Sequence, residues 1–228
     1  MDLMNSYYDY WWENPRDVRS PIFRRLNEEV FEALRGTRGR HALDIGSGKG
    51  TIVRLLRSLG FAVTAVESNP LFARRLEDLM PEVTVVCADV RKWNPVHTYE
   101  IATCIEVAQV LSHDDLRDLL RRIRPRVGRI LLNISNMWSL HGTWVRVRGF
   151  QAPFIVNYTP RDLRRIVTDS GYNIIRELGV GFVTPVTMWK DFRGVVISQR
   201  AAHFLASLDI AFPRQCHLYL VDALSPQA

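Results

Sequence analysis

Cysteine is scarce in this chain, and long apolar runs are missing from it. The 228 residues include three cysteines, Cys87, Cys104 and Cys216, which are odd in number and far apart, so the disulfide framework of a small secreted protein is not expected. The sequence has no Cys-x-x-Cys pair and no histidine cluster, so it predicts no metal site. It also lacks an uninterrupted apolar stretch of about 18 residues, which a membrane-spanning helix needs.

The N-terminal sequence does not combine a basic segment with an apolar core, so it does not predict a secretory signal peptide. Apolar residues make up 47% of the chain and charged residues 24%, which is typical of a globular protein. A chain of this length is sufficient for one domain with a sizeable core and insertions. We therefore expect a reduced, cytoplasmic protein.

Lysine is also scarce, so arginine supplies almost all of the positive charge. The formal net charge is +6, and the lysines are Lys49, Lys92 and Lys190. The arginines are scattered along expected helix surfaces and form no single block. This pattern is typical of solvated helix faces and argues against nucleic acid as a partner. Peripheral contact with a membrane surface, or attraction to another anionic partner, stays open.

Segments of strand character alternate with segments of helical periodicity from His41 onward. We expect strands at 42–45, 63–67, 83–87, 99–106, 129–135, 174–178 and 216–221. We expect helices at 21–35, 50–58, 70–79, 113–123 and 160–170. This alternation predicts an α/β fold, in which a mostly parallel, doubly wound sheet carries helices on both faces.

The rhythm of strands and helices also suggests how the chain is divided. Residues 1–40 form an aromatic-rich, helical N-terminal segment, and residues 41–228 form the main domain. Two stretches, near 136–158 and 183–213, interrupt the alternation and are interpreted as inserts on the substrate side of the sheet. In the N-terminal segment, apolar residues at every fourth position predict one buried helix face. These residues are Ile22, Leu26, Val30 and Leu34.

The stretch from Ala42 to Thr51 reads A-L-D-I-G-S-G-K-G-T and is the most informative part of the sequence. An apolar strand ends near Asp44, and glycines follow at alternate positions. Glycine lets the backbone turn sharply and approach a ligand closely, because it has no Cβ. A loop between a strand and a helix is also where open α/β sheets bind nucleotides.

Two common phosphate-binding patterns fit this loop poorly. A P-loop needs a glycine where Leu43 stands and a serine or threonine where Gly50 stands, and Asp44 would repel phosphates. In the dinucleotide pattern G-x-G-x-x-G, the third glycine would have to come one residue later than it does. Neither phosphate-binding pattern therefore describes this loop well.

The next two expected strands also end in acids. Glu67 follows Asp44 at close to the interval of about 20 residues that is typical of a carboxylate bound to ribose hydroxyls. Asp89 follows Glu67 at a similar interval. Each acid alone is equally typical of a helix N-cap or a solvated loop. Three acids in this register, beside the glycine loop, favour a ligand site.

An acid followed by x-G-x-G-x-G resembles motif I of the class I S-adenosylmethionine-dependent methyltransferases. The resemblance covers about residues 40–180 and, further along the chain, the last expected strand. Within the family, the sequence resembles the small-molecule branch that includes ubiquinone- and menaquinone-type enzymes. It implies a Rossmann-like, seven-stranded sheet whose last strand is antiparallel, and S-adenosyl-L-methionine as the cofactor. It also implies methyl transfer to an oxygen or nitrogen of a small, aromatic or apolar metabolite.

The resemblance assigns the glycine loop to the methionine part of the cofactor. Gly46, Ser47 and Gly48 would pass against that part, and Asp44 would help to orient its amino group. The protein then mainly orients the reactants and excludes water, because the cofactor itself carries the reactive methyl group.

The other acids are assigned by the same resemblance to the nucleoside. Glu67 would take both ribose hydroxyls, with Ser68 beside it among the cofactor-binding residues. Asp89 would accept a hydrogen bond from the adenine amino group, and Val90 would offer its backbone N–H.

The end of the fourth expected strand would lie beside the sulfonium. Ile105 and Glu106 occupy this position, and Tyr8 in the N-terminal segment would close over the cofactor. Quinone-type relatives often carry C-x-E-V-x-E-H here, whereas this chain has Gln109 and Val110 at the last two positions. A general base inherited from that motif is therefore not assigned. The chain also lacks the Asp/Asn-Pro-Pro-aromatic motif and the Pro-Cys nucleophile of enzymes that act on nucleobases.

An acceptor oxygen has to lose its proton, commonly to a histidine or a carboxylate. His113 and His141 are the catalytic candidates, because both regions would border the substrate opening. The alternatives are a residue at a helix start for His113 and simple packing for His141. Aromatic residues of the first insert would wall an apolar acceptor. These residues are Trp138, Trp144 and Phe150.

Two other functions stay open at this point. The chain could be a non-catalytic cofactor-binding protein on the same fold, because a fold does not fix a function. It could also be a methyltransferase that acts on RNA or at a membrane surface, given its arginines and its second insert. The identity of the acceptor and the oligomeric state are not predicted.

Overall fold

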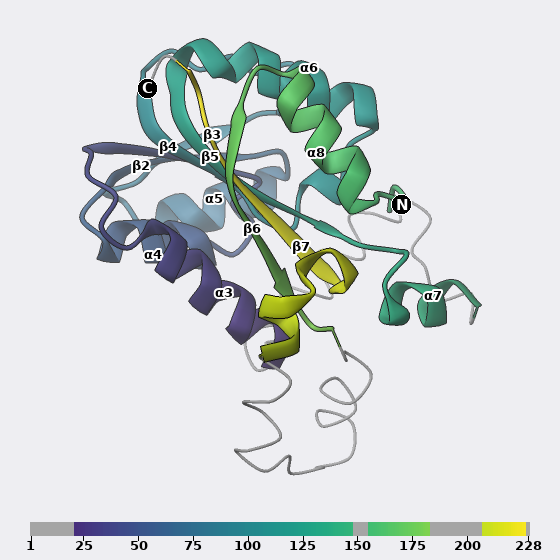
Figure 1. Ribbon diagram of the computed structural model, residues 1–228. Coiled ribbons are helices and arrows are strands. Elements are labelled where there is room, and N and C mark those ends of the chain that lie inside the picture. Colours follow the sequence, from purple (N-terminus) through teal and green to yellow (C-terminus); the bar gives the residue numbers. More distant parts are fainter. Residues whose placement is uncertain (1–20, 148–154, 183–206, 227–228) are drawn as a thin grey trace.

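The computed structural model describes residues 21–147, 155–182 and 207–226. One seven-stranded sheet forms its centre, with the strand order β3-β2-β1-β4-β5-β7-β6 (Figure 1). The strands are β1 (His41–Ile45), β2 (Ala62–Glu67), β3 (Thr84–Cys87), β4 (Tyr99–Cys104), β5 (Val127–Ser135), β6 (Asn173–Val180) and β7 (Leu218–Leu224). The α-helices are α3 (Pro21–Leu34), α4 (Thr51–Ser58), α5 (Pro70–Leu79), α6 (His113–Ile123), α7 (Leu140–Val147) and α8 (Pro160–Asp169).

The sheet is mostly parallel, and its reversal occurs at the last strand. The pairs β3–β2, β2–β1, β1–β4 and β4–β5 are parallel, whereas β7 is antiparallel to both β5 and β6. This order confirms the predicted doubly wound sheet with an antiparallel last strand. It also brings the start of β7 to the same edge as the end of β5, since Ser135 pairs with Leu218.

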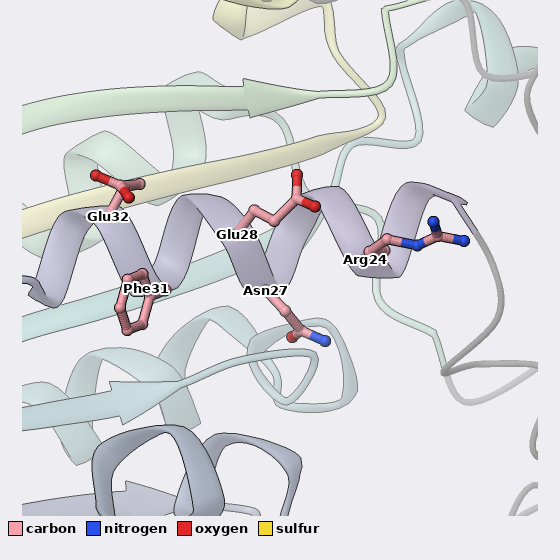
Figure 2. A pocket seen from close by; sticks show the side chains of 5 residues that line it. All are labelled: Arg24, Asn27, Glu28, Phe31 and Glu32. Atoms are coloured by element: carbon pink, nitrogen blue, oxygen red, sulfur yellow. The ribbon is translucent and has the colours of Figure 1, made fainter. Parts of the chain in front are cut away.

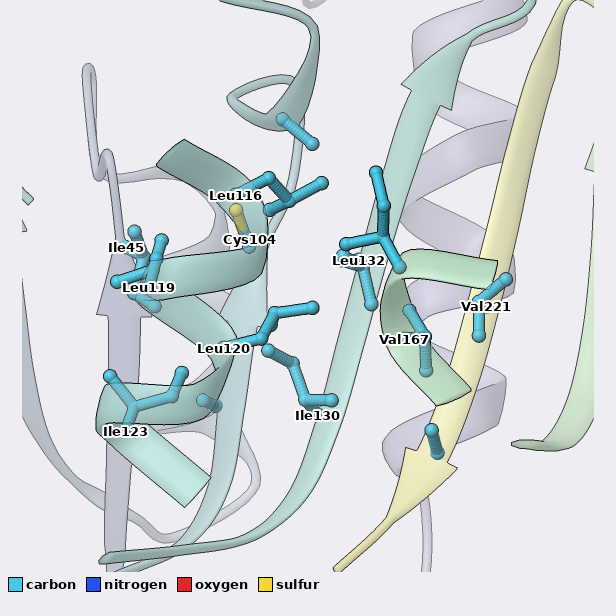
Figure 3. Packing of buried hydrophobic residues seen from close by; sticks show 14 of the residues in the cluster. Ile45, Cys104, Leu116, Leu119, Leu120, Ile123, Ile130, Leu132, Val167 and Val221 are labelled. Atoms are coloured by element: carbon cyan, nitrogen blue, oxygen red, sulfur yellow. The ribbon is translucent and has the colours of Figure 1, made fainter. Parts of the chain in front are cut away.

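Helices cover both faces of the sheet. One buried cluster joins the sheet to α6 and α8. It includes Leu116, Leu119 and Val167 from these helices, and Leu132 and Val221 from the sheet (Figure 3). The other joins the opposite face to α3, α4 and α5, which lie together on that side of the sheet in Figure 1. The inner strands β1, β2, β4 and β7 are mostly buried, as expected where helices cover both faces, whereas the edge strands β3 and β6 are largely exposed or half-buried.

The apolar stripe predicted in the N-terminal segment is the buried face of α3. Ile22, Leu26, Val30 and Leu34 are all buried there. Three later helices, α5, α6 and α8, begin at polar N-cap residues. Thr159 and Asp162 form a reciprocal capping box at the start of α8, which agrees with the helix start expected there.

Several boundaries differ from the sequence-based expectations, and two strands show the larger differences. The strand expected at 99–106 ends at Cys104, because the chain turns sharply at Glu106, whose φ is 62°. The last strand, expected at 216–221, runs from Leu218 to Leu224. It continues through Asp222 because Arg129 pairs with that carboxylate.

The insert near 136–158 contains a helix, α7, which its irregular apolar pattern did not predict. At the start of α7 the chain packs tightly, and a Cβ on Gly142 would lie 2.4 Å from the Cα of Met137. Most of the insert near 183–213 lies outside the described residues, where only the helical turn at 207–211 and a 3-10 turn at Pro213–Gln215 belong to it. Among the described helices, none is both long and apolar enough to cross a bilayer.

A buried ion pair ties the N-terminal helix to the sheet. Arg129 on β5 contacts both carboxylate oxygens of Asp222 on β7, at 2.7 and 2.5 Å, and Asp222 is 1% exposed. The same guanidinium donates to the carbonyl of Ala33 and to the hydroxyl of Thr37. Arg129 therefore joins β5, β7 and the end of α3.

Replacing Asp222 by alanine should lower the free energy of unfolding by about 3–5 kcal/mol, because Arg129 would keep a largely buried charge without its counter-ion. Urea unfolding followed by circular dichroism measures this loss. The control is Asp118→Ala at an exposed position of α6, which should change the value by less than about 0.5 kcal/mol. Similar losses in the two variants would contradict this role for the pair.

Candidate functional site

The expected cofactor residues lie at the carboxyl ends of four neighbouring strands. Asp44 lies near the end of β1, Glu67 ends β2, Asp89 follows β3, and Glu106 follows β4. These strands are adjacent and parallel in the order β3-β2-β1-β4, so their ends form one edge of the sheet. This edge is where ligands bind in open α/β folds.

The glycine loop after β1 has a backbone that only glycine adopts easily. Gly46, Gly48 and Gly50 have φ values of 71°, 47° and 74°. The N–H groups of Gly46 and Ser47 both donate to the carbonyl of Val66, which holds the loop against β2. A Cβ on Gly46 would lie 2.3 Å from Cγ2 of Val107, so the chain after β4 closes over this glycine.

Glu67 fixes the middle of this loop. Its Oε2 accepts from the N–H of Gly48 at 2.8 Å, and its Oε1 accepts from the N–H of Asn69 at 2.8 Å. The hydroxyl of Ser68, an exposed residue, lies 3.5 Å from the same Oε1. The side chain is 7% exposed. One carboxylate therefore joins the end of β2, the start of α5 and the glycine loop.

Asp44 is a buried acid with one free oxygen. It is 2% exposed, and its Oδ1 accepts from the hydroxyl of Thr103 on β4 at 2.7 Å. Its Oδ2 is buried and has no hydrogen-bond partner among the described residues. Burial raises the pKa of Asp44 to about 6, against the opposing effect of the Thr103 hydrogen bond. An unsatisfied buried acceptor is costly and favours a ligand that donates a hydrogen.

Asp89 is bound by a residue that the sequence analysis did not single out. Nε and Nη2 of Arg91 contact the Asp89 carboxylate, the closest pair being 2.6 Å apart, and the backbone N–H of Arg91 also donates to it. Hydrogen bonding to Arg91 lowers the pKa of Asp89. Val90 beside it is buried, and its carbonyl accepts from Arg122. An adenine amino group at this position would therefore share the Asp89 oxygens with Arg91.

A second polar cluster lies at the end of β4. Glu106 and Gln109, which follow β4, form it together with Asn133 on β5. The N–H of Glu106 donates to Oδ1 of Asn133 at 2.6 Å, and Nδ2 of Asn133 donates back to Oε1 of Glu106. Nε2 of Gln109 donates to Oε2 of Glu106 at 3.2 Å. Ile105, next to it, is buried.

The two histidine candidates have different surroundings. His113 is the first residue of α6 and packs on the ring of Tyr158, with a centroid separation of 4.4 Å. His141 on α7 is 7% exposed and lies against His217, with a centroid separation of 4.3 Å. Burial lowers the pKa of both His141 and His217, the latter to about 3. The pair is therefore neutral near pH 7.

Sequence reasoning missed several residues that complete this edge. Thr103, Asn133 and His217 reach the site only through the pairing of distant strands, which no local pattern shows. Tyr8 and Phe150 lie outside the described residues. Trp138 is 61% exposed, and the guanidinium of Arg146 lies 4.0 Å from its ring centroid.

A separate hollow of about 360 Å³ lies along α3 (Figure 2). None of the expected cofactor residues lines it. Its lining consists of Arg24, Asn27, Glu28, Phe31 and Glu32.

Comparisons with known proteins agree with this fold. Residues 42–127 match a family described as a methyltransferase domain. A ubiquinone biosynthesis O-methyltransferase from Schizosaccharomyces pombe is 27% identical over 149 residues, which cover 58% of this chain and 53% of that protein. The chain thus aligns with about half the length of this curated relative.

Two solved structures share the fold. The N-methyltransferase NodS from Bradyrhizobium japonicum WM9, in complex with S-adenosyl-L-homocysteine, superposes with a TM-score of 0.68 at 12% identity, covering 99% of this chain and 100% of that one. The magnesium protoporphyrin IX methyltransferase from Synechocystis PCC 6803 gives a TM-score of 0.60 at 14% identity, covering 88% and 82% of the two chains. Residues 42–127 are therefore similar to a methyltransferase domain, and the chain has the fold of S-adenosylmethionine-dependent methyltransferases of known structure.

Replacing Gly46 by alanine should weaken binding of S-adenosylhomocysteine by about tenfold or more, because the new Cβ would push the loop away from Val107. Isothermal titration calorimetry measures the affinity. The matched control is Gly60→Ala, where φ is also positive, at 91°, but where no atom lies within 4 Å of the new Cβ. Both variants should lose stability, by about 1–2 kcal/mol for the left-handed backbone. Unchanged affinity in the Gly46 variant would contradict this account of the loop.

The pKa of Asp44 in the folded protein, about 6, lies above its ordinary value of 3.8. The folded protein therefore binds this proton more tightly than the unfolded chain, and its stability falls as the pH rises from about 4 to about 6. The D44N variant does not titrate there. It should be more stable than the wild type by up to about 3 kcal/mol at pH 7.5, with a smaller difference at pH 4. Urea unfolding at both pH values measures this, and a difference that does not depend on pH would contradict it.

Proposed function

We propose that the chain transfers the methyl group of S-adenosylmethionine to a small molecule, and that the edge formed by Asp44, Glu67 and Asp89 holds the cofactor. The observation that carries this proposal is the unsatisfied Oδ2 of Asp44 beside a glycine loop. A buried carboxylate oxygen that lacks a donor suits the amino group of the methionine part. The glycines of the adjacent loop lack a Cβ, so the methionine part of the cofactor can approach the loop backbone closely.

The other residues fit the nucleoside in the same manner. Each oxygen of the Glu67 carboxylate accepts a backbone N–H and keeps capacity to accept a ribose hydroxyl. Asp89 and the backbone of Val90, which follow β3, are proposed to bind the adenine edge. The bound cofactor supplies an electrophilic methyl group. The chain's part is to fix the two reactants in line and to exclude water.

The acceptor side is proposed to lie beyond Glu106, along the end of β5 and α7. There α7 presents exposed apolar side chains, including Trp144 at 38% and Leu140 at 63% exposure. Such residues favour an acceptor with an aromatic or apolar body. His141, which packs against His217, lies at the same edge and is the candidate to receive a proton there.

Replacing Glu67 by alanine should weaken S-adenosylhomocysteine binding by about 1–3 kcal/mol, since both the ribose contact and the anchor of Gly48 would be lost. Calorimetric titration gives the affinity. The control is Glu77→Ala at an exposed position of α5, which should bind like the wild type. If the wild type itself does not bind S-adenosylhomocysteine at millimolar concentration, the proposed function is wrong.

A further inference from the structure

The chain bends at Glu106 in a conformation that is unfavourable for its side chain. Glu106 is the only non-glycine residue with positive φ in the part of the chain that the structure describes. Such strained residues persist where the surrounding structure holds them, and they often lie at functional sites. Here Asn133 holds the bend, because it accepts from the backbone N–H of Glu106 and donates to its carboxylate.

The side-chain amides of Asn133 and Gln109 both direct their NH2 groups at the Glu106 carboxylate. The Nδ2 of Asn133 donates to one carboxylate oxygen, and the Nε2 of Gln109 donates to the other. The amide of Gln109 cannot be reversed without placing its oxygen against the carboxylate. Its Oε1 is buried and has no hydrogen-bond partner among the described residues, and Gln109 is 5% exposed.

The cluster therefore offers acceptors and lacks a positive charge. Within the described ranges, no lysine, arginine or histidine forms an ion pair with Glu106. Glu106 is partly exposed, so a ligand can reach it, and the buried Gln109 is hydrogen-bonded to its carboxylate. A largely enclosed carboxylate without a counter-ion favours a ligand that brings hydrogens and positive charge.

We propose that Glu106 and the Oε1 of Gln109 together bind the nucleophilic group of the methyl acceptor, and that this group is a primary amine that arrives as an ammonium ion. The inference rests on the proposed function and specifies that the acceptor atom that receives the methyl group is a nitrogen. A hydroxyl has one hydrogen, whereas an ammonium ion has three and supplies both acceptors. A catechol also brings two hydrogens, but it brings no positive charge.

The reaction balances with these groups alone. The ammonium ion passes one proton to the Glu106 carboxylate, which leaves a neutral amine with a free electron pair. That pair forms the new N–C bond as the C–S bond breaks, and the electrons of the C–S bond stay on sulfur. The positive charge moves from the sulfonium to the methylated nitrogen. Burial raises the pKa of Glu106, which favours its acceptance of the proton.

The test uses S-adenosylmethionine labelled with carbon-13 in its methyl group. The purified 228-residue chain is incubated with a metabolite extract. Benzylamine, benzyl alcohol, aniline, phenol and catechol have been added to this extract. Nuclear magnetic resonance then identifies the atom that carries the labelled methyl. We expect labelled carbon on nitrogen. Labelled carbon on oxygen or carbon, including a methylated catechol, would overturn the inference while the proposed function stands.

Two variants test the residues separately. Glu106→Gln should lower kcat/KM for the amine by at least about a hundredfold, the usual contribution of a general base, and Gln109→Met should mainly raise its KM. Gln109→Met should keep wild-type affinity for S-adenosylhomocysteine, and the matched control Glu77→Gln should keep wild-type rates. Full activity in Glu106→Gln would overturn the inference. A wild type that binds S-adenosylhomocysteine but methylates nothing would overturn both the inference and the catalytic part of the proposed function.

Discussion

The hydrogen bond from the Gly48 amide to the Glu67 carboxylate is the contact on which the arrangement of this edge depends. It joins the loop after β1 to the end of β2, and the other oxygen of Glu67 holds the start of α5 through Asn69. The glycines can follow this path because their φ values are positive. The same path brings Gly46 under Val107, so the loop also sets the position of the chain after β4.

The edge carries unfavourable features that the rest of the fold offsets. Asp44 is buried with an unsatisfied oxygen, and Glu106 holds a left-handed backbone. Two features of the fold hold these residues in place. The apolar faces of the helices pack on both sides of the sheet, and the buried pair of Arg129 and Asp222 joins β5 to β7. Features that lower stability in the free protein are typical of sites that bind a ligand.

Local patterns predicted most of the fold, because strand and helix periodicity, glycines and caps are local signals. The three acids could be placed on one edge because parallel strands end together. Thr103, Asn133 and Gln109 could not be found in this way, since their contacts depend on strand pairing and on the turn after β4. The pairing of Asp89 with Arg91 was missed for a different reason, because neighbouring opposite charges are common and carry little local signal. The helix α7 was missed because its apolar residues are exposed.

A crystal structure with S-adenosylhomocysteine bound tests the central claim most directly. The account predicts that the amino group of the ligand lies within hydrogen-bonding distance of Oδ2 of Asp44, and that the ribose hydroxyls contact Glu67. A ligand bound elsewhere, for example in the hollow beside α3, or one that leaves Oδ2 of Asp44 without a donor, would contradict it.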